Sequence, residues 1–112
     1  MPIVMAQTKS VIPLTKLGIG LTREASGSYY QLECNPNGGN HPKPDITCAF
    51  VYSLNGNLSQ TIGRGRDCQI IAKPFAVTVI GEYEGEEISY HEIFENECQA
   101  RNLFNDLFPN GK

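Results

Sequence analysis

Two histidines and a cluster of carboxylates are the side chains whose types and spacing could support catalysis or metal binding. The segment His-Glu-Ile-Phe-Glu at 91–95 has only the first half of the His-Glu-x-x-His zinc motif, so we interpret His91 as an exposed residue on a helix. His41 lies in a proline-rich loop, where a surface or turn role is expected. Three carboxylates at 83–87 indicate a solvated hairpin tip, with a weak cation site as the alternative. We therefore predict a protein that is not an enzyme and that binds no metal or cofactor.

The segment GRGRDCQIIAKPF has the composition of a displayed binding loop. Its first half is charged and glycine-rich, and we interpret residues 63–67 as a flexible flank, with anion binding as the alternative. Its second half holds Ile70 and Ile71 between Cys68 and Pro74. Loops seldom expose two adjacent β-branched residues to water, so this pair is expected to bind a partner. A short buried strand is the alternative.

The chain has four cysteines, Cys34, Cys48, Cys68 and Cys98. Their number and spacing indicate whether the protein works in an oxidising or a reducing compartment. None lies in a Cys-x-x-Cys pair, which disfavours a zinc site. An even number in a small domain predicts two disulfides, an oxidising compartment and hence secretion. Spacing alone leaves all three pairings open. The first ten residues hold one lysine and no long apolar segment, so we expect the sequence to be written in its mature form.

Length and charge narrow the class of protein. The 112 residues fit one domain with one core, and we expect a single domain over 1–112 with flexible ends at 1–10 and 109–112. A net charge of −3 argues against nucleic acid or an anionic membrane as the partner. No apolar run approaches the ~18 residues of a spanning helix.

Period-two alternation of apolar residues predicts the strands that must position the displayed loop. The predicted strands lie at residues 15–21, 30–34, 75–79 and, as a short return strand, around Ile88. Turns are expected at 24–28 and at Glu84-Gly85, and residues 35–44 are expected to be loop because they hold three prolines.

Two helices are predicted from capping signals and 3.6-residue spacing. The first is expected to start at an N-cap, Asp45, and to end at Asn55-Gly56. The second is expected from a capping box, Ser89-x-x-Glu92. Their inward residues would be Ile46, Ala49, Phe50 and Leu54 in the first, and Tyr90, Ile93/Phe94 and Cys98 in the second. The apolar residues of the tail, from Leu103 to Phe108, are predicted to form a last strand. Strands and helices without βαβ alternation favour an antiparallel α+β domain.

Three segments of the chain resemble the Streptomyces subtilisin inhibitor family: HPKPDITCAF, CQIIAKPFAVTVIGEYEG and ISYHEIFENEC. Members of that family carry a His-Pro-x-Pro loop, a reactive loop between a cysteine and a proline, and a Ser-Tyr-x-x-x-Phe-x-Asn-Glu-Cys helix. The matching residues here are His41 to Pro44, Cys68 to Pro74 and Ser89 to Cys98. The resemblance extends from about residue 30 to residue 102.

The resemblance implies a five-stranded antiparallel β-sheet packed by two α-helices. It also implies the disulfide pairing Cys34–Cys48 and Cys68–Cys98. It allows a homodimer formed through a face of the sheet.

The resemblance further implies a secreted, substrate-like inhibitor of serine proteases. Ile70 would fill the primary specificity pocket of the protease, and Ile70–Ile71 would be the reactive bond. Asn96 would support the loop with its side-chain amide, and Pro74 would stiffen the end of the loop. The remaining loop residues expected to contact the protease are Asp67, Cys68, Gln69, Ala72 and Lys73.

Three positions depart from the family pattern and affect the choice of target. Gln69 replaces the family's proline, Asp67 stands where relatives tend to be apolar, and Ile70 stands where they often show Met, Leu or Lys. The target protease could thus be subtilisin-like, chymotrypsin-like or elastase-like. These substitutions support one alternative, a secreted binding module for a partner that is not a serine protease. A further alternative is a metalloprotease inhibitor that acts through another surface, the acidic residues 82–87.

Overall fold

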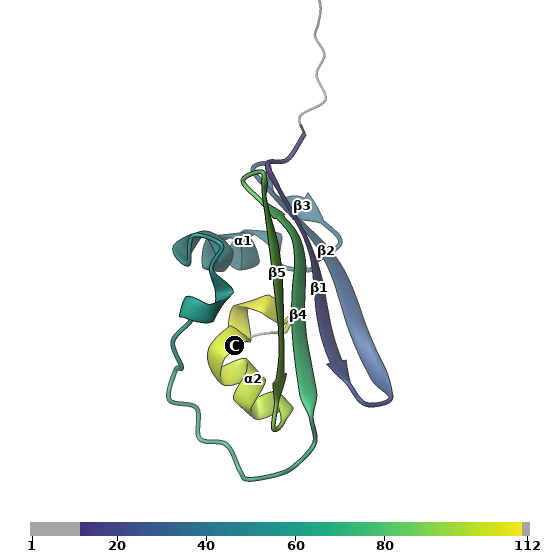
Figure 1. The fold of residues 1–112 in the computed structure, drawn as a ribbon, viewed down its shortest axis with the longest axis vertical. Helices are drawn as coiled ribbons and strands as arrows, with labels where there is room; N and C mark the ends of the chain where they lie inside the picture. The colour runs from purple at the N-terminus through teal and green to yellow at the C-terminus, as the bar shows by residue number, and fades with distance from the viewer. Residues whose placement is uncertain (1–11, 111–112) are drawn as a thin grey trace, which may run out of the picture.

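The computed structural model describes residues 12–110, which form one antiparallel sheet covered on one face by two helices (Figure 1). The sheet order is β3-β2-β1-β4-β5. In chain order the elements are β1 (Thr15–Arg23), β2 (Ser26–Cys34), β3 (Gly38–Gly39), α1 (Pro44–Ser53), the 3₁₀ turn η1 (Leu58–Gln60), β4 (Phe75–Tyr83), β5 (Glu86–Phe94), α2 (Glu97–Phe104) and the 3₁₀ turn η2 (Asn105–Leu107). This arrangement confirms the predicted α+β class and the five-stranded sheet with two helices.

The core lies between the sheet and the helices because alternate side chains of each strand point to that face. The strands β1 and β4 provide most of the sheet's buried core residues, namely Leu17, Ile19, Leu21, Phe75, Val77 and Val79. The helices contribute residues such as Val51, Ala100 and Phe104, which are fully buried against the sheet. Each large apolar side chain buried in this way stabilises the fold by about 1.5–3 kcal/mol.

Both predicted hairpins are present, and the strands run further than the alternation alone indicated. The turn between β4 and β5 consists of Glu84 and Gly85, both with positive φ, as two-residue hairpin turns require. The turn between β1 and β2 is tighter than predicted, because Arg23 already pairs with Ser26. The predicted loop after Cys34 contains β3, which adds a two-residue edge strand.

The predicted start of the second helix was wrong. Ser89 and Glu92 lie in β5, which pairs with β4 along its whole length, from Tyr83↔Glu86 to Phe75↔Phe94. Nine residues of ladder pairing with a central strand outweigh a local capping pattern. The helix α2 begins after Asn96, whose Oδ1 accepts a hydrogen bond from the backbone N–H of Gln99 at 2.9 Å.

The predicted strand in the tail was also wrong. Leu103 and Phe104 end α2, and Leu107 lies in η2. Phe104 and Leu107 are fully buried, so the apolar pattern of the tail reflected helical packing against the sheet. Phe108 follows and stacks on Phe75 of β4 with ring centroids 5.6 Å apart.

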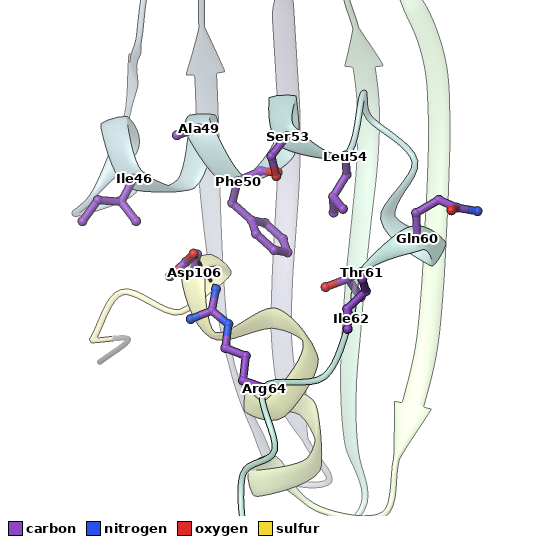
Figure 2. Close-up of a pocket in the computed structure, with 10 residues that line it drawn as sticks. All are labelled: Ile46, Ala49, Phe50, Ser53, Leu54, Gln60, Thr61, Ile62, Arg64 and Asp106. Carbon is purple, nitrogen blue, oxygen red and sulfur yellow. Dashed lines mark hydrogen bonds and ion pairs between the residues drawn. The ribbon is translucent and has the colours of Figure 1, made fainter.

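Helix α1 has the predicted end but a different inward face. Asn55 and Gly56 adopt positive φ after the helix, and Gly56 N–H donates to the Val51 carbonyl at 3.0 Å. The helix begins at Pro44, so Asp45 lies in its first turn and is not the N-cap. The buried residues are Thr47, Cys48 and Val51, whereas the expected inward face of Ile46, Ala49, Phe50 and Leu54 lines a surface groove with Ile62 (Figure 2).

The disulfide pairing explains this rotation of α1 about its axis. Cys48 bonds to Cys34 of β2, with the two Cα atoms 5.8 Å apart, so this face of the helix must meet the sheet. The side chain of Ile46 is consequently 52% exposed. Both disulfides match the pairing that the resemblance implied, Cys34–Cys48 and Cys68–Cys98.

His41 is buried, which corrects the predicted surface role. Only 3% of its side chain is exposed. Nε2 lies 2.8 Å from the Leu107 carbonyl oxygen, and Nδ1 accepts a hydrogen bond from the backbone N–H of Lys43 at 3.0 Å. With Nδ1 accepting and Nε2 donating, the ring ties the loop before α1 to the C-terminal 3₁₀ turn. This histidine therefore has a structural role.

Within residues 12–110, no helix is long and apolar enough to cross a membrane.

Candidate functional site

The candidate site is the 61–74 loop, which connects η1 to β4 without regular secondary structure. In Figure 1 the loop descends beside α2 and turns at the end of the molecule before entering β4. Ile70 is 90% exposed and Ile71 is 44% exposed, so the alternative of a short buried strand is wrong. A large apolar side chain presented to water in this way can insert into a pocket of a partner protein.

Asn96 joins the loop to the start of α2. Its Nδ2 donates to the carbonyl oxygens of Ile71, at 2.8 Å, and of Gln69, at 3.3 Å. Its Oδ1 is already occupied by the N–H of Gln99, which fixes the orientation of the amide and directs Nδ2 toward the loop. One buried side chain therefore caps the helix and holds the backbone on both sides of Ile70.

Two further restraints act next to the exposed isoleucines. Cys68 is bonded to Cys98 of α2, with Cα atoms 5.7 Å apart. On the other side, the backbone N–H of Lys73 donates to the Glu95 carbonyl oxygen at 2.9 Å, and Pro74 leads into β4. Residues 69–72 therefore form a short exposed bridge between two fixed points.

The charged flank is attached to the protein body, contrary to the prediction of a flexible flank. Arg64 Nη2 lies 2.7 Å from a carboxylate oxygen of Asp106. The backbone N–H groups of Arg64 and Arg66 both donate to Asn102 Oδ1 at 2.9 Å. Asn102 was not among the loop contacts expected from the sequence.

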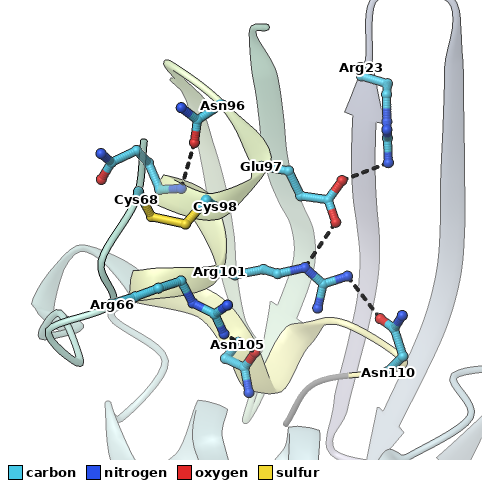
Figure 3. A network of polar contacts seen from close by, with 10 residues as sticks. Arg23, Arg66, Cys68, Asn96, Glu97, Cys98, Arg101, Asn105 and Asn110 are labelled. Atoms are coloured by element: carbon cyan, nitrogen blue, oxygen red, sulfur yellow. Dashed lines mark hydrogen bonds and ion pairs between the residues drawn. A yellow bond between two sulfur atoms is a disulfide. The ribbon is translucent and has the colours of Figure 1, made fainter. Parts of the chain in front are cut away.

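A network of polar side chains fixes the start of α2 against the sheet (Figure 3). Glu97 accepts hydrogen bonds from Arg23 of β1, at 2.6 Å, and from Arg101 Nε, at 2.9 Å. Arg101 also donates to Asn110 and lies over the Phe108 ring, 4.1 Å from the centroid. Because Glu97 lies between Asn96 and Cys98, this network orients both residues that hold the loop.

A cavity of about 520 Å³ lies between the loop and the body of the protein. Gln69, Ile71 and Lys73 contribute from the loop side. Phe75 and Glu97 are among the residues that contribute from the sheet and from α2. Residues 69–73 therefore face the body across this cavity, and hydrogen bonds and the disulfide join the two.

The other side chains considered for chemistry lie in β5 and in the β4–β5 turn. His91 is exposed, as expected, but on a strand, where its Nδ1 lies 2.8 Å from Thr78 Oγ1. Glu84 in the hairpin turn accepts a hydrogen bond from Tyr52, and burial together with this contact raises the pKa of Tyr52. No group of three or more possible metal ligands is clustered in the part of the chain that the structure describes.

The chain is similar in sequence to a family of known inhibitors. A family model described as "Subtilisin inhibitor-like" matches residues 8–96. The subtilisin inhibitor of Streptomyces albogriseolus is 33% identical over 85 residues, covering 73% of this chain and 58% of that protein. Subtilisin inhibitor-like protein 5 of Streptomyces fradiae is 38% identical over 79 residues, covering 69% of this chain and 74% of that protein.

A solved structure shows the same fold. Streptomyces caespitosus sermetstatin, in complex with Bacillus licheniformis subtilisin, superposes with a TM-score of 0.68 at 20% identity, covering 85% of this chain and 94% of that one. The chain therefore belongs to the subtilisin inhibitor-like family. The relatives named above are inhibitors rather than enzymes, which agrees with the prediction made from the sequence. The chain spans a little over half the length of the S. albogriseolus relative.

Proposed function

We propose that this protein is a substrate-like inhibitor of serine proteases and that Ile70–Ile71 is its reactive bond. The observation that carries the proposal is the presentation of this bond. Ile70 is almost fully exposed, while the carbonyls of Gln69 and Ile71 on either side are held by Asn96. A loop ordered before binding loses little conformational entropy when it enters an active site, which favours tight binding.

The same restraints explain why a bound inhibitor would not be consumed. If the protease serine attacks the Ile70 carbonyl carbon, the peptide bond breaks and the amine of Ile71 becomes the leaving group. The segment that carries this amine stays attached to the body of the inhibitor through the Lys73 N–H and the Asn96 side chain. The amine can then attack the acyl-enzyme ester, reform the bond and return a proton to the serine oxygen through the protease's general base. Religation competes with hydrolysis because the amine stays in place.

The residues around the reactive bond would contact the protease. Besides Ile70 and Ile71, the proposed contacts are Asp67, Cys68, Gln69, Ala72 and Lys73, with Asn96 and Pro74 as supports.

The two disulfides support a secreted protein that works in an oxidising compartment. Ile80 and Ile93, more than half exposed on the sheet, support a homodimer, which light scattering would detect.

Titration of a protease panel tests the proposed function. We expect stoichiometric loss of activity for at least one serine protease among subtilisin, elastase, chymotrypsin and trypsin. A β-branched Ile70 suits a shallow, elastase-like primary pocket better than a deep slot. Inhibition of thermolysin alone would instead indicate a metalloprotease inhibitor. No inhibition across the panel would support a binding module with a different partner.

Asp67 should weaken inhibition of subtilisin. It lies three residues before Ile70, where the fourth specificity pocket of a subtilisin-like protease is apolar, and an ionised carboxylate loses hydration there without gaining a partner. We expect Asp67→Leu to lower the inhibition constant for subtilisin at least about tenfold, which corresponds to about 1.4 kcal/mol. Asp45→Leu, at an exposed carboxylate in α1, is the control and should leave the inhibition constant unchanged, although it removes the hydrogen bond from Asn37 Nδ2. An unchanged constant for Asp67→Leu would show that this residue does not enter the pocket.

A further inference from the structure

The segment before the reactive bond is held by a second asparagine of α2. Asn102 Oδ1 accepts hydrogen bonds from the backbone N–H groups of Arg64 and Arg66, each at 2.9 Å. The Asn102 backbone carbonyl also receives the Arg64 N–H, at 3.2 Å. A glycine at position 63 permits this approach, because a Cβ there would lie 2.8 Å from Asn102 Nδ2. The side chain of Asn102 is therefore fitted against the loop backbone.

Neighbouring contacts attach the same segment to the same part of the chain. Thr61 Oγ1 donates to the Leu103 carbonyl oxygen at 2.6 Å. Farther along, Arg66 Nη2 donates to Asn105 Oδ1 at 3.3 Å. Asn102 differs from these contacts because its single oxygen holds two alternate N–H groups of the loop backbone. It thereby fixes the direction in which the chain approaches Cys68.

We infer that Asn102 is a positioning residue for the reactive bond, acting on the segment before Ile70 as Asn96 acts on the backbone around it. This inference rests on the proposed inhibitory function. Without the Asn102 side chain, the Arg66 N–H would lose its acceptor, and the segment just before Cys68 would be held mainly through the flexible side chains of Arg64 and Arg66. With it, the segment that ends at Ile70 is fixed at two points along α2. The Ile70 carbonyl carbon then stays within reach of the Ile71 amine after cleavage, which favours religation over hydrolysis.

Two substitutions of nearly equal size separate the hydrogen bonds from the packing of this side chain. Asn102→Leu removes the acceptor, whereas Asn102→Asp keeps an oxygen in the same place. The control is Asn40→Leu, which removes a comparable contact, from the Gln31 N–H to Asn40 Oδ1 at 2.6 Å, at the edge of the sheet away from the loop. All variants are compared with the parent for their thermal midpoint.

Two measurements are made on each variant. The first is hydrogen exchange at the Arg64 and Arg66 amides, which needs no protease. The second is the inhibition constant, together with the fraction of Ile70–Ile71 cut by a catalytic amount of the protease that the parent inhibits best. For Asn102→Leu we expect faster exchange at Arg66 and an inhibition constant raised about tenfold, as expected for the loss of one or two neutral hydrogen bonds. We also expect more cut chain at equilibrium.

Asn102→Asp should restore slow exchange and tight inhibition, and Asn40→Leu should leave both at the level of the parent. If Asn102→Leu exchanges faster at Arg66 yet inhibits and resists cleavage like the parent, Asn102 orders the flank without positioning the reactive bond, and the inference is overturned. Equal losses in Asn102→Leu and Asn40→Leu would also overturn it, because general destabilisation would then be the cause. Failure of the parent to inhibit any protease would contradict the proposed function itself, which is a different outcome.

Discussion

A protein in which Cys68 and Cys98 are both replaced by serine should be cleaved by the protease that its parent inhibits. The disulfide is the covalent link between α2 and the segment just before Ile70. Removing it frees roughly three residues, and ordering each costs about 1–2 kcal/mol on binding. We therefore expect the inhibition constant to rise about a hundredfold to ten-thousandfold. The acyl segment could also move away from the Ile71 amine, so that hydrolysis goes to completion.

Mass spectrometry after incubation with the best protease of the panel checks this result, by detecting a new amino terminus at Ile71. The matched control replaces Cys34 and Cys48, which join β2 to α1 at a distance in sequence from the loop. In the chain-entropy description the two bridges stabilise the fold by similar amounts, about 3 kcal/mol for Cys34–Cys48 and about 4 kcal/mol for Cys68–Cys98. The control should therefore lose stability but still inhibit. An uncut Cys68→Ser, Cys98→Ser variant with the parent's affinity would rule out the disulfide-braced loop as the mechanism.

Replacing Ile70 by lysine should create a trypsin inhibitor. Trypsin has an aspartate at the base of its primary pocket, and a lysine at the reactive bond would pair with it while the rest of the loop keeps its shape. Pairing of a desolvated charge at an interface supports a gain of about a hundredfold or more in affinity over the parent. The parent should not inhibit trypsin through Lys73, because Pro74 follows it and restricts the backbone at that bond.

Inhibition constants for trypsin, measured on proteins with circular dichroism spectra like the parent's, test this expectation. Ile62→Lys is the matched control, because Ile62 is 83% exposed in the same loop but lies eight residues before Ile70. Only Ile70→Lys should inhibit trypsin. If both variants leave trypsin untouched while the fold is intact, the 61–74 loop is not the inhibitory site.

Much of the sheet could be predicted from local sequence, because strand alternation and turn chemistry are local properties. The alternation around Leu17 and Val77 gave the buried faces of β1 and β4, and Glu84-Gly85 gave the turn of the β4–β5 hairpin. The second helix could not be placed in the same way. Tyr90, Ile93 and Phe94 fit helical spacing, whereas in the strand Phe94 is buried and Ile93 is exposed on the opposite face. The choice depends on pairing with β4, which no local pattern records. An asparagine three residues before Gln99 was the available signal for the true N-cap.

Some features of the candidate site could likewise be predicted from local sequence, whereas others depended on the tertiary structure. The exposed pair at Ile70 followed from composition, since cysteine, charge and proline around two β-branched residues do not suit a core strand. The support of the loop by Asn96 was implied by the family resemblance, and its geometry appeared only in the fold, where one amide caps α2 and holds two loop carbonyls. Asn102 carried no sequence signal, because an asparagine in a helix is usually a solvated surface residue.

By itself, the sequence determined the fold class, two hairpins, two disulfides in an unspecified pairing, and a displayed loop ending at Pro74. The tertiary structure decided which face of α1 is buried, where α2 begins and which side chains hold the loop. It also decided that His41 is buried. The physical reason is sequence separation. Alternation and turns depend on neighbours a few residues apart, whereas the contacts from Asn96 and Asn102 to the loop join residues 25 to 38 positions apart. Such contacts form only when the sheet and α2 have brought the segments together.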